Sequence, residues 1–186
     1  MKNVLIGTLT ALILSFSVSS TAVANKGKAP GAQNIVEIAL SDPENFSILV
    51  DLVVFAELDG VLSGEGQFTV FAPTNEAFAD LIGALTEALG EEATNALLSD
   101  KAFVTDVLLY HVTDGRRFSN SLINKNNPKM VEMLNGDYIV VNSNATITDG
   151  SPLTADSMID TSVAGESFNI SASNGVIHVI KSVLVP

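Results

Sequence analysis

The chain has 186 residues, with 21 Asp and Glu against 9 Lys and Arg, which gives a formal net charge of −12. This charge argues against electrostatic binding to nucleic acid or to anionic membranes, because phosphate groups would be repelled. The sequence has no cysteine, which excludes disulfides, thiolate metal sites and cysteine nucleophiles. Hydrophobic residues make up 47% of the chain, enough for one domain with its own core.

The first 24 residues have the pattern of a secretory signal peptide. Lys2 gives a basic start, an apolar run covers residues 4–18, and Ala22 and Ala24 are the small residues of a cleavage site. The alternative is an uncleaved membrane anchor, but the run falls short of the roughly 20 apolar residues that span a bilayer. We therefore expect cleavage after Ala24 and no transmembrane segment afterwards. The product would be secreted to the periplasm, the cell surface or the medium.

A folded domain is expected over residues 34–186, after a polar, flexible linker at 25–33. Apolar residues at 35–40 predict a short helix. Asp42 and Pro43 predict the N-cap and first residue of the next helix, and Asp59-Gly60 predicts its end.

A strand and further helices follow. The aromatic and β-branched run Phe68–Phe71 predicts a buried strand, which Pro73 ends because proline cannot donate to a sheet ladder. Thr74 and Ser99 are placed to cap two later helices. The apolar residues expected on the buried faces of these helices are Phe78, Leu81, Ile82, Leu85, Phe103, Val104, Val107 and Leu108.

The second half of the chain changes to a strand-rich pattern. Asn135-Gly136 and Asn174-Gly175 each lie between β-prone runs and predict hairpins with type I′ turns, since both residues tolerate positive φ. Ala145–Ile147 and Ser182–Val185 predict two more short strands. Helices followed by hairpins indicate an α+β fold with mostly antiparallel pairing.

Three motifs resemble those of the fasciclin domain family, in the family's order. The run Phe68–Phe78 (FTVFAPTNEAF) resembles the first homology box, Tyr110-His111 resembles the Tyr-His pair, and Asn174–Ile180 (NGVIHVI) resembles the second box. The resemblance implies a single fasciclin domain, a β-wedge of short strands flanked by several helices. It also implies a small, secreted bacterial member of a family associated with adhesion and extracellular-matrix contacts.

Five residues of these motifs are candidates for partner binding: Thr74, Asn75, Glu76, Tyr110 and His111. A structural role is the alternative for each. The first box can simply join a strand to a capped helix, and a histidine after a helix typically donates a ring N–H to a backbone carbonyl. The resemblance supports a binding role for Tyr110 and His111, because the Tyr-His region is linked to integrin-type cell binding in the family. His178, on an apolar strand, is interpreted as a core residue.

Integrin binding and catalysis are not expected. The family often has an acidic residue after the second box, whereas Lys181 follows Ile180 here and cannot offer a carboxylate to a receptor-bound cation. The sequence lacks a nucleophile elbow, a zinc-protease motif and a P-loop. No metal site and no cofactor are expected.

Two classes of function remain. The first is a secreted, non-catalytic interaction module that contacts an extracellular protein or polysaccharide, with cell adhesion or biofilm as its setting. The alternative is a carrier of a lipophilic, carotenoid-like molecule in the periplasm or medium, since some members of the resembled family bind carotenoids and an apolar wedge can open a groove. Pigment or lipid bound to the native protein would favour the second class.

Overall fold

A computed structural model of the chain describes residues 31–151, 156–162, 165 and 167–186. The expected signal peptide and most of the expected linker lie outside these residues. At the end of the linker, the Gln33 carbonyl accepts a hydrogen bond from Ser173 N–H at 2.7 Å. This hydrogen bond joins the end of the expected linker to the turn between β7 and β8.

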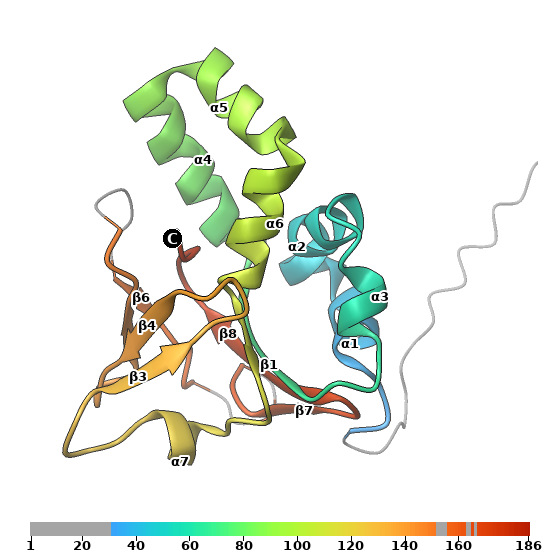
Figure 1. The fold of residues 1–186 in the computed structure, drawn as a ribbon, viewed down its shortest axis with the longest axis vertical. Helices are drawn as coiled ribbons and strands as arrows, with labels where there is room; N and C mark the ends of the chain where they lie inside the picture. Colours follow the sequence, from blue (N-terminus) through green and yellow to red (C-terminus); the bar gives the residue numbers. More distant parts are fainter. Residues whose placement is uncertain (1–30, 152–155, 163–164, 166) are drawn as a thin grey trace, which may run out of the picture.

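Helices fill most of the first half of the described chain, and strands most of the second (Figure 1). The first half contains α1 (Ile35–Ser41), α2 (Pro43–Phe55), α3 (Asp59–Leu62), β1 (Phe68–Pro73), α4 (Asn75–Leu89), α5 (Glu91–Ser99) and α6 (Lys101–Leu109). The second contains β2 (Val112–Asp114), α7 (Ser119–Leu122), β3 (Lys129–Glu132), β4 (Tyr138–Val141), β5 (Thr146–Thr148), β6 (Ser157–Met158), β7 (Ile170–Ala172) and β8 (Gly175–Ile180).

The strands form two four-stranded sheets that meet as a wedge. The first sheet has the order β2-β1-β8-β7 and the second the order β3-β4-β5-β6. An isolated bridge between Ile159 and Ile180 links the second sheet to the first. β1 and β8 pair in parallel, and the other strand pairs of the described residues are antiparallel. The predicted α+β fold with mostly antiparallel pairing is confirmed.

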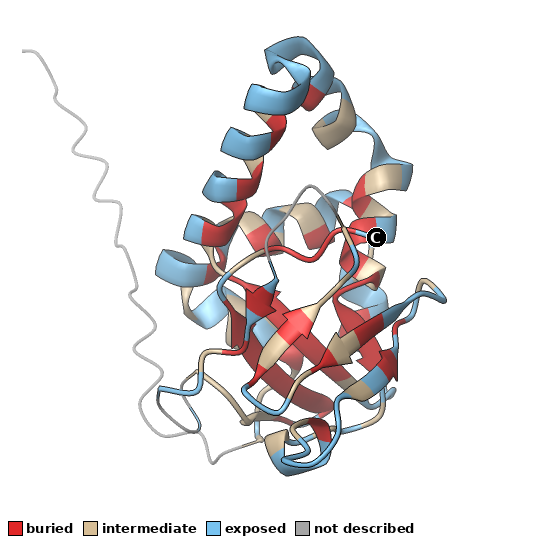
Figure 2. Ribbon diagram, turned by 90° about the vertical axis from the view of Figure 1, so that its left-hand side faces the viewer, coloured by how far each residue is buried: buried red, intermediate tan, exposed pale blue. Residues whose placement is uncertain are grey.

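The first sheet separates two hydrophobic cores. Because side chains alternate along a strand, β1 sends Val70 and Ala72 into the core beneath the helices and Phe71 into the core between the sheets. β8 is buried on both faces, as its apolar alternation predicted. Figure 2 shows buried residues filling the sheets and the inner sides of the helices, while the outer sides of α4 and α5 are exposed.

Most predicted helix starts are confirmed, with local corrections. The Thr74 hydroxyl accepts from Ala77 N–H at 3.3 Å and caps α4. Asp42 occupies the N-cap position of α2, but its carboxylate accepts from the Asn45 side chain at 2.9 Å and not from the backbone. The prediction that Ser99 caps α6 is wrong, because Asp100 caps it through Ala102 N–H at 2.9 Å. Asp59-Gly60 begins α3; α2 has already ended at Phe55.

The two hairpins are confirmed, but their predicted turn type is wrong. In the first, five residues separate β3 from β4, and only Gly136 has a positive φ, at 97°. In the second, Ala172 pairs with Gly175, so Ser173 and Asn174 form the turn and neither has a positive φ. The predicted strand at Ser182–Val185 is absent, because Leu184 and Val185 donate their N–H groups to side chains.

Candidate functional site

Tyr110 and His111 lie where α6 passes into β2, and both point into the protein. The His111 ring is 2% exposed; its Nδ1 lies 2.7 Å from the Val107 carbonyl, and its Nε2 lies 2.9 Å from Leu184 N. A backbone N–H can only donate, so Nε2 accepts and Nδ1 carries the hydrogen. This confirms the expected hydrogen bond from the ring to a backbone carbonyl. It also ties the end of α6 to the C-terminal segment, Val183–Pro186.

Tyr110 supports the same segment through Asp149. The tyrosine is 1% exposed, and its O–H contacts the backbone carbonyls of Asp149 at 2.9 Å and Tyr138 at 3.2 Å. The Asp149 carboxylate in turn accepts from Val185 N–H at 3.1 Å. Tyr110 and His111 therefore form a latch that holds the C-terminal segment against the core; we call these two residues the Tyr-His latch.

The buried titratable rings are uncharged near neutral pH. Burial lowers the pKa of His111 to about 4, and burial, helped by the negative charges of Asp149 and Asp137, raises the pKa of Tyr110 to about 12. His178 stacks on Phe71 with ring centroids 5.9 Å apart, and its Nε2 lies 2.9 Å from the Arg117 carbonyl. Burial lowers its pKa as well. The expected core role of His178 is confirmed.

Asn75 fastens the start of α4 to the first turns of α2. Its side-chain carbonyl accepts from Ile48 N–H at 3.0 Å, and its amide donates to the Glu44 carbonyl at 2.9 Å and the Ser47 hydroxyl at 3.0 Å. Ile48 and Glu44 are four residues apart, the spacing of a helical hydrogen bond, so the asparagine amide engages both backbone groups of one turn. Glu76 beside it is exposed. A partner role for Thr74, Asn75, Glu76, Tyr110 and His111 stays a prediction.

Asn75→Ala is expected to lower the free energy of unfolding by about 2 kcal/mol, because four groups of α2 lose a hydrogen-bond partner: Ile48 N–H, the Pro43 and Glu44 carbonyls and the Ser47 hydroxyl. Urea denaturation followed by circular dichroism measures this change. Asn45→Ala is the matched control. Asn45 is exposed, and within the described part of the chain its amide donates to Asp42, three residues away, so this change should stay within about 0.5 kcal/mol. Equal effects of the two substitutions would contradict the fastening role.

Two further residues, Asn174 and Asp149, have structural roles that the sequence does not indicate. The Asn174-Gly175 pattern predicts a turn, yet the Asn174 side chain accepts from Ile35 N–H at 3.0 Å and donates to the Leu62 carbonyl at 2.7 Å. Asp149 precedes a glycine, which is a turn signal, and its carboxylate instead bonds the C-terminal segment. Both contacts join residues that are far apart in the sequence, and no local sequence pattern indicates them.

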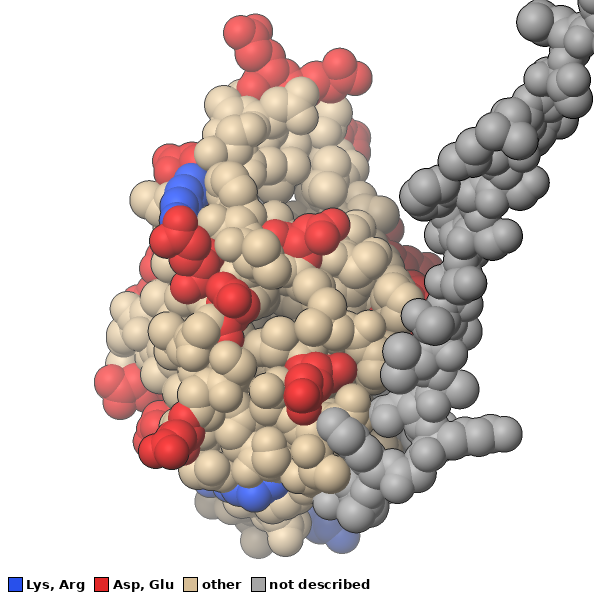
Figure 3. Space-filling model, turned by 90° about the vertical axis from the view of Figure 1, so that its right-hand side faces the viewer, with Lys and Arg blue, Asp and Glu red and all other residues tan. Residues whose placement is uncertain are grey.

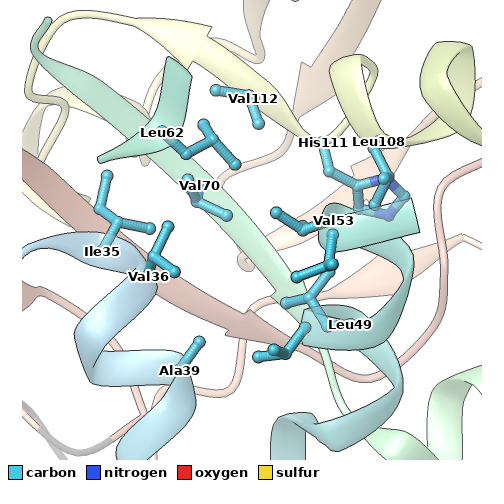
Figure 4. Close-up of a pocket in the computed structure, with 12 residues that line it drawn as sticks. Ile35, Val36, Ala39, Leu49, Val53, Leu62, Val70, Leu108, His111 and Val112 are labelled. Atoms are coloured by element: carbon cyan, nitrogen blue, oxygen red, sulfur yellow. The ribbon is translucent and has the colours of Figure 1, made fainter. Parts of the chain in front are cut away.

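An apolar groove opens between α1, α2 and α3. In Figure 4, Ile35, Val36 and Ala39 of α1 lie across the hollow from Leu49 and Val53 of α2, and Val70 of β1 lies beneath. Val54 lines the rim and is 57% exposed. We call this hollow and its rim the α1–α3 groove. It encloses about 40 Å³.

A second apolar cleft lies on the other side of α2. It has a volume of about 110 Å³ and is lined by side chains from α2, α4, α5 and α6, among them Leu52, Phe78 and Phe103. The α1–α3 groove and this cleft are apolar on their walls, so shape and hydrophobic contact govern what they can hold. Across the described residues, no cluster of three His, Asp or Glu side chains is arranged to hold a metal ion.

The wedge of two sheets and the helical cover define a small α+β domain with apolar hollows between its helices. The chain belongs to the fasciclin domain family, whose model matches residues 44–186. A solved structure with the same fold is a FAS1 domain pair from the insect cell adhesion molecule fasciclin I. It matches with a TM-score of 0.61 and 16% identity, over 84% of this chain and 52% of that one.

Relatives come from bacteria and animals. Protein sll1483 of Synechocystis is 33% identical over 173 residues, which cover 91% of this chain and 83% of the relative. The transforming growth factor-beta-induced protein ig-h3 of rabbit (Oryctolagus cuniculus) is 33% identical over 159 residues. Human periostin is 26% identical over 159 residues. The match covers 20% of ig-h3 and 16% of periostin, so the chain corresponds to a small part of each animal protein.

Proposed function

We propose that the protein is a secreted, non-catalytic interaction module that makes adhesion-type contacts with an extracellular protein or polysaccharide. The observation that carries this proposal is membership of the fasciclin family together with the fold of a FAS1 domain pair from a cell adhesion molecule. The apolar groove between surface helices supports it, since exposed apolar patches mark interaction sites.

The state of the two histidines supports the non-catalytic part of the proposal. A general base needs an imidazole that can reach a substrate and exchange a proton. His111 and His178 are the only histidines of the chain, and both are buried with both ring nitrogens bonded to the backbone. Both imidazoles therefore stabilise the fold through these hydrogen bonds.

An attachment assay in the native host tests the proposal. Deletion of the gene is expected to reduce attachment of cells to a surface or to one another, and purified protein added to the medium should restore it. Retained cells are counted by microscopy after washing. Unchanged attachment of the deletion strain under every growth condition would contradict the adhesion role.

The secreted state makes a separate prediction about the N-terminus. Signal peptidase should cut after Ala24, so intact-mass spectrometry of the native protein should give a chain that begins at Asn25. Ala24→Arg places a large charged side chain at the cleavage site and should cause the uncleaved chain to accumulate. A native chain that retains residues 1–24 would contradict this prediction. No helix among the described residues is long and apolar enough to span a membrane.

A carrier of a lipophilic molecule is the second candidate, and the cleft between α2 and α4–α6 favours it. Its apolar walls suit a neutral ligand, although about 110 Å³ admits only part of a carotenoid-sized chain unless the helices separate. Absorbance and mass spectrometry of protein purified from its native source distinguish the two candidates. Bound pigment or lipid in stoichiometric amount would favour the carrier.

A further inference from the structure

The three helices around the α1–α3 groove expose an unusual share of the large apolar side chains. Of the ten such exposed residues in the described chain, four belong to α1, α2 or α3: Leu40, Val54, Phe55 and Val61. Val54 lines the groove itself, and Leu40, Phe55 and Val61 are exposed elsewhere on the helices that border it. Exposed apolar side chains on helices that border a hollow are typical of a docking site.

The size of the groove favours a side chain over a lipid as its occupant. About 40 Å³ is more than one water needs and is close to the space that the end of one aliphatic side chain fills. The lining side chains include Val36 and Ala39 of α1 and Val50 and Val54 of α2, so two neighbouring helices border the hollow. An amphipathic helix can lay its apolar stripe along such a surface and insert one residue into the hollow.

The charge around the groove defines the polar face of that helix. No Lys or Arg occurs between Lys28 and Lys101, so all the charged residues of α1, α2 and α3 are acidic. Glu37, Asp51 and Asp59 are exposed on these helices. Figure 3 shows this side of the molecule, where Asp and Glu surround an uncharged, hollowed surface and Lys and Arg lie at the margins of the view. Such a field attracts a basic partner and repels an acidic one.

We propose that the α1–α3 groove docks a basic amphipathic helix of a partner protein, with aliphatic residues on one face and Lys or Arg on the other. The inference rests on the proposed function, because it names the surface and the partner chemistry through which the interaction module works. A second copy of this chain fits the same groove less well, because its own α1–α3 face is acidic.

A designed peptide tests the proposal directly. The probe is a synthetic helical peptide with Leu at i, i+3, i+4 and i+7 and Lys on the opposite face. Two matched peptides carry Glu in place of Lys, or the same Leu and Lys residues in scrambled order. Isothermal titration calorimetry is expected to show binding of the Leu/Lys peptide alone. Backbone hydrogen exchange of the complex should show protection concentrated in residues 35–62.

Paired variants separate specific docking from general attraction. Leu40→Ser with Val54→Ser should weaken binding about tenfold or more, whereas Leu89→Ser with Met130→Ser should leave it unchanged. The two pairs remove side chains of similar exposure, 58% and 57% against 48% and 66%. Asp51→Lys should weaken binding more than Glu87→Lys, although both exposed residues change the net charge equally.

Several outcomes would overturn the proposal. If the Glu peptide bound as tightly as the Lys peptide, the partner would not need to be basic. If Asp51→Lys and Glu87→Lys had equal effects, binding would depend on the net charge of the protein and not on the groove. Self-association that the Leu40→Ser and Val54→Ser changes abolish would assign the groove to a second copy. Because the peptide assay uses purified protein, its result does not depend on whether the protein mediates the attachment of cells. If the peptide bound but the deletion strain attached normally, the adhesion role would be refuted and the docking of a basic helix in the groove would not.

Discussion

Gly175→Ala is expected to destabilise the protein by about 3 kcal/mol or more, because a methyl group at this position has no room. A Cβ added to Gly175 would lie 2.2 Å from the Phe68 carbonyl oxygen and 2.6 Å from Cδ1 of Ile35. Gly175 pairs with Phe68 at the start of the parallel β1–β8 ladder, so relief of the clash requires the central strands to separate. Thermal and urea denaturation measure the loss.

Gly83→Ala is the control for this substitution. Gly83 lies within α4, and nothing is found within 4 Å of its added Cβ. Alanine there should stabilise the protein by about 0.5 to 1 kcal/mol, because glycine is a poor helix former. If Gly175→Ala lowered the free energy of unfolding no more than Gly83→Ala does, β8 would not approach β1 as closely as the structure shows.

Acidification is expected to weaken the fold through His111. The pKa of the ring is lowered to about 4 in the folded protein and returns to near 6.5 on unfolding. Between these values the unfolded chain binds a proton that the folded chain does not. The stabilisation is therefore complete above about pH 6.5 and is lost as the pH falls toward 4, by about 3 kcal/mol in total. The physical reason is the burial of the ring, which disfavours the charged imidazole. A proton on Nε2 would also face Leu184 N–H inside the core.

A variant without the titrating group isolates this contribution. His111→Asn should be less stable than the wild type at pH 7, and its free energy of unfolding should fall less steeply between pH 6.5 and pH 4. The acidic residues contribute equally to both proteins, so the difference in slope belongs to His111. Parallel pH profiles would mean that the buried imidazole does not exchange protons as described.

Local features of this fold could be predicted from the sequence, because neighbouring residues determine them. Thr74 caps α4, Pro73 ends β1, and the alternation along β8 correctly indicates a strand buried on both faces. The pairing of β1 with β8 in parallel could not be predicted in this way. It joins Phe68 to Gly175 across most of the domain, and no local pattern encodes the direction of such a pairing.

The candidate sites show the same division. The hydrogen bond from His111 to a backbone carbonyl was predictable from its place after a helix, whereas its second partner, Leu184, is distant in sequence. The Asn-Gly signal at Asn174 located the hairpin but gave the wrong turn, because the side chain is drawn to Ile35 and Leu62. The position of the α1–α3 groove could not be predicted, since its walls come from four helices, two strands and the latch residue His111.

The structure separates the residues that hold the domain from those that can meet a partner. The Tyr-His latch and Asn75 make hydrogen bonds within the protein, and the two cores lie on either side of the first sheet. The exposed apolar side chains of α1, α2 and α3 do not hold the domain together in this way. They lie on helices whose charged residues are all acidic. Substitutions at the exposed rim residue Val54 are therefore expected to cost little stability, whereas lining residues such as Leu49 and Val53 also belong to the core.

Attachment of a deletion strain that expresses defined variants is the most direct test of the proposed role. Wild-type protein and the control variant with Leu89→Ser and Met130→Ser should restore attachment. The groove variant with Leu40→Ser and Val54→Ser should not restore it, although it is secreted and folded to the same extent. Full restoration by the groove variant would exclude the groove, and normal attachment of the deletion strain itself would contradict the adhesion function.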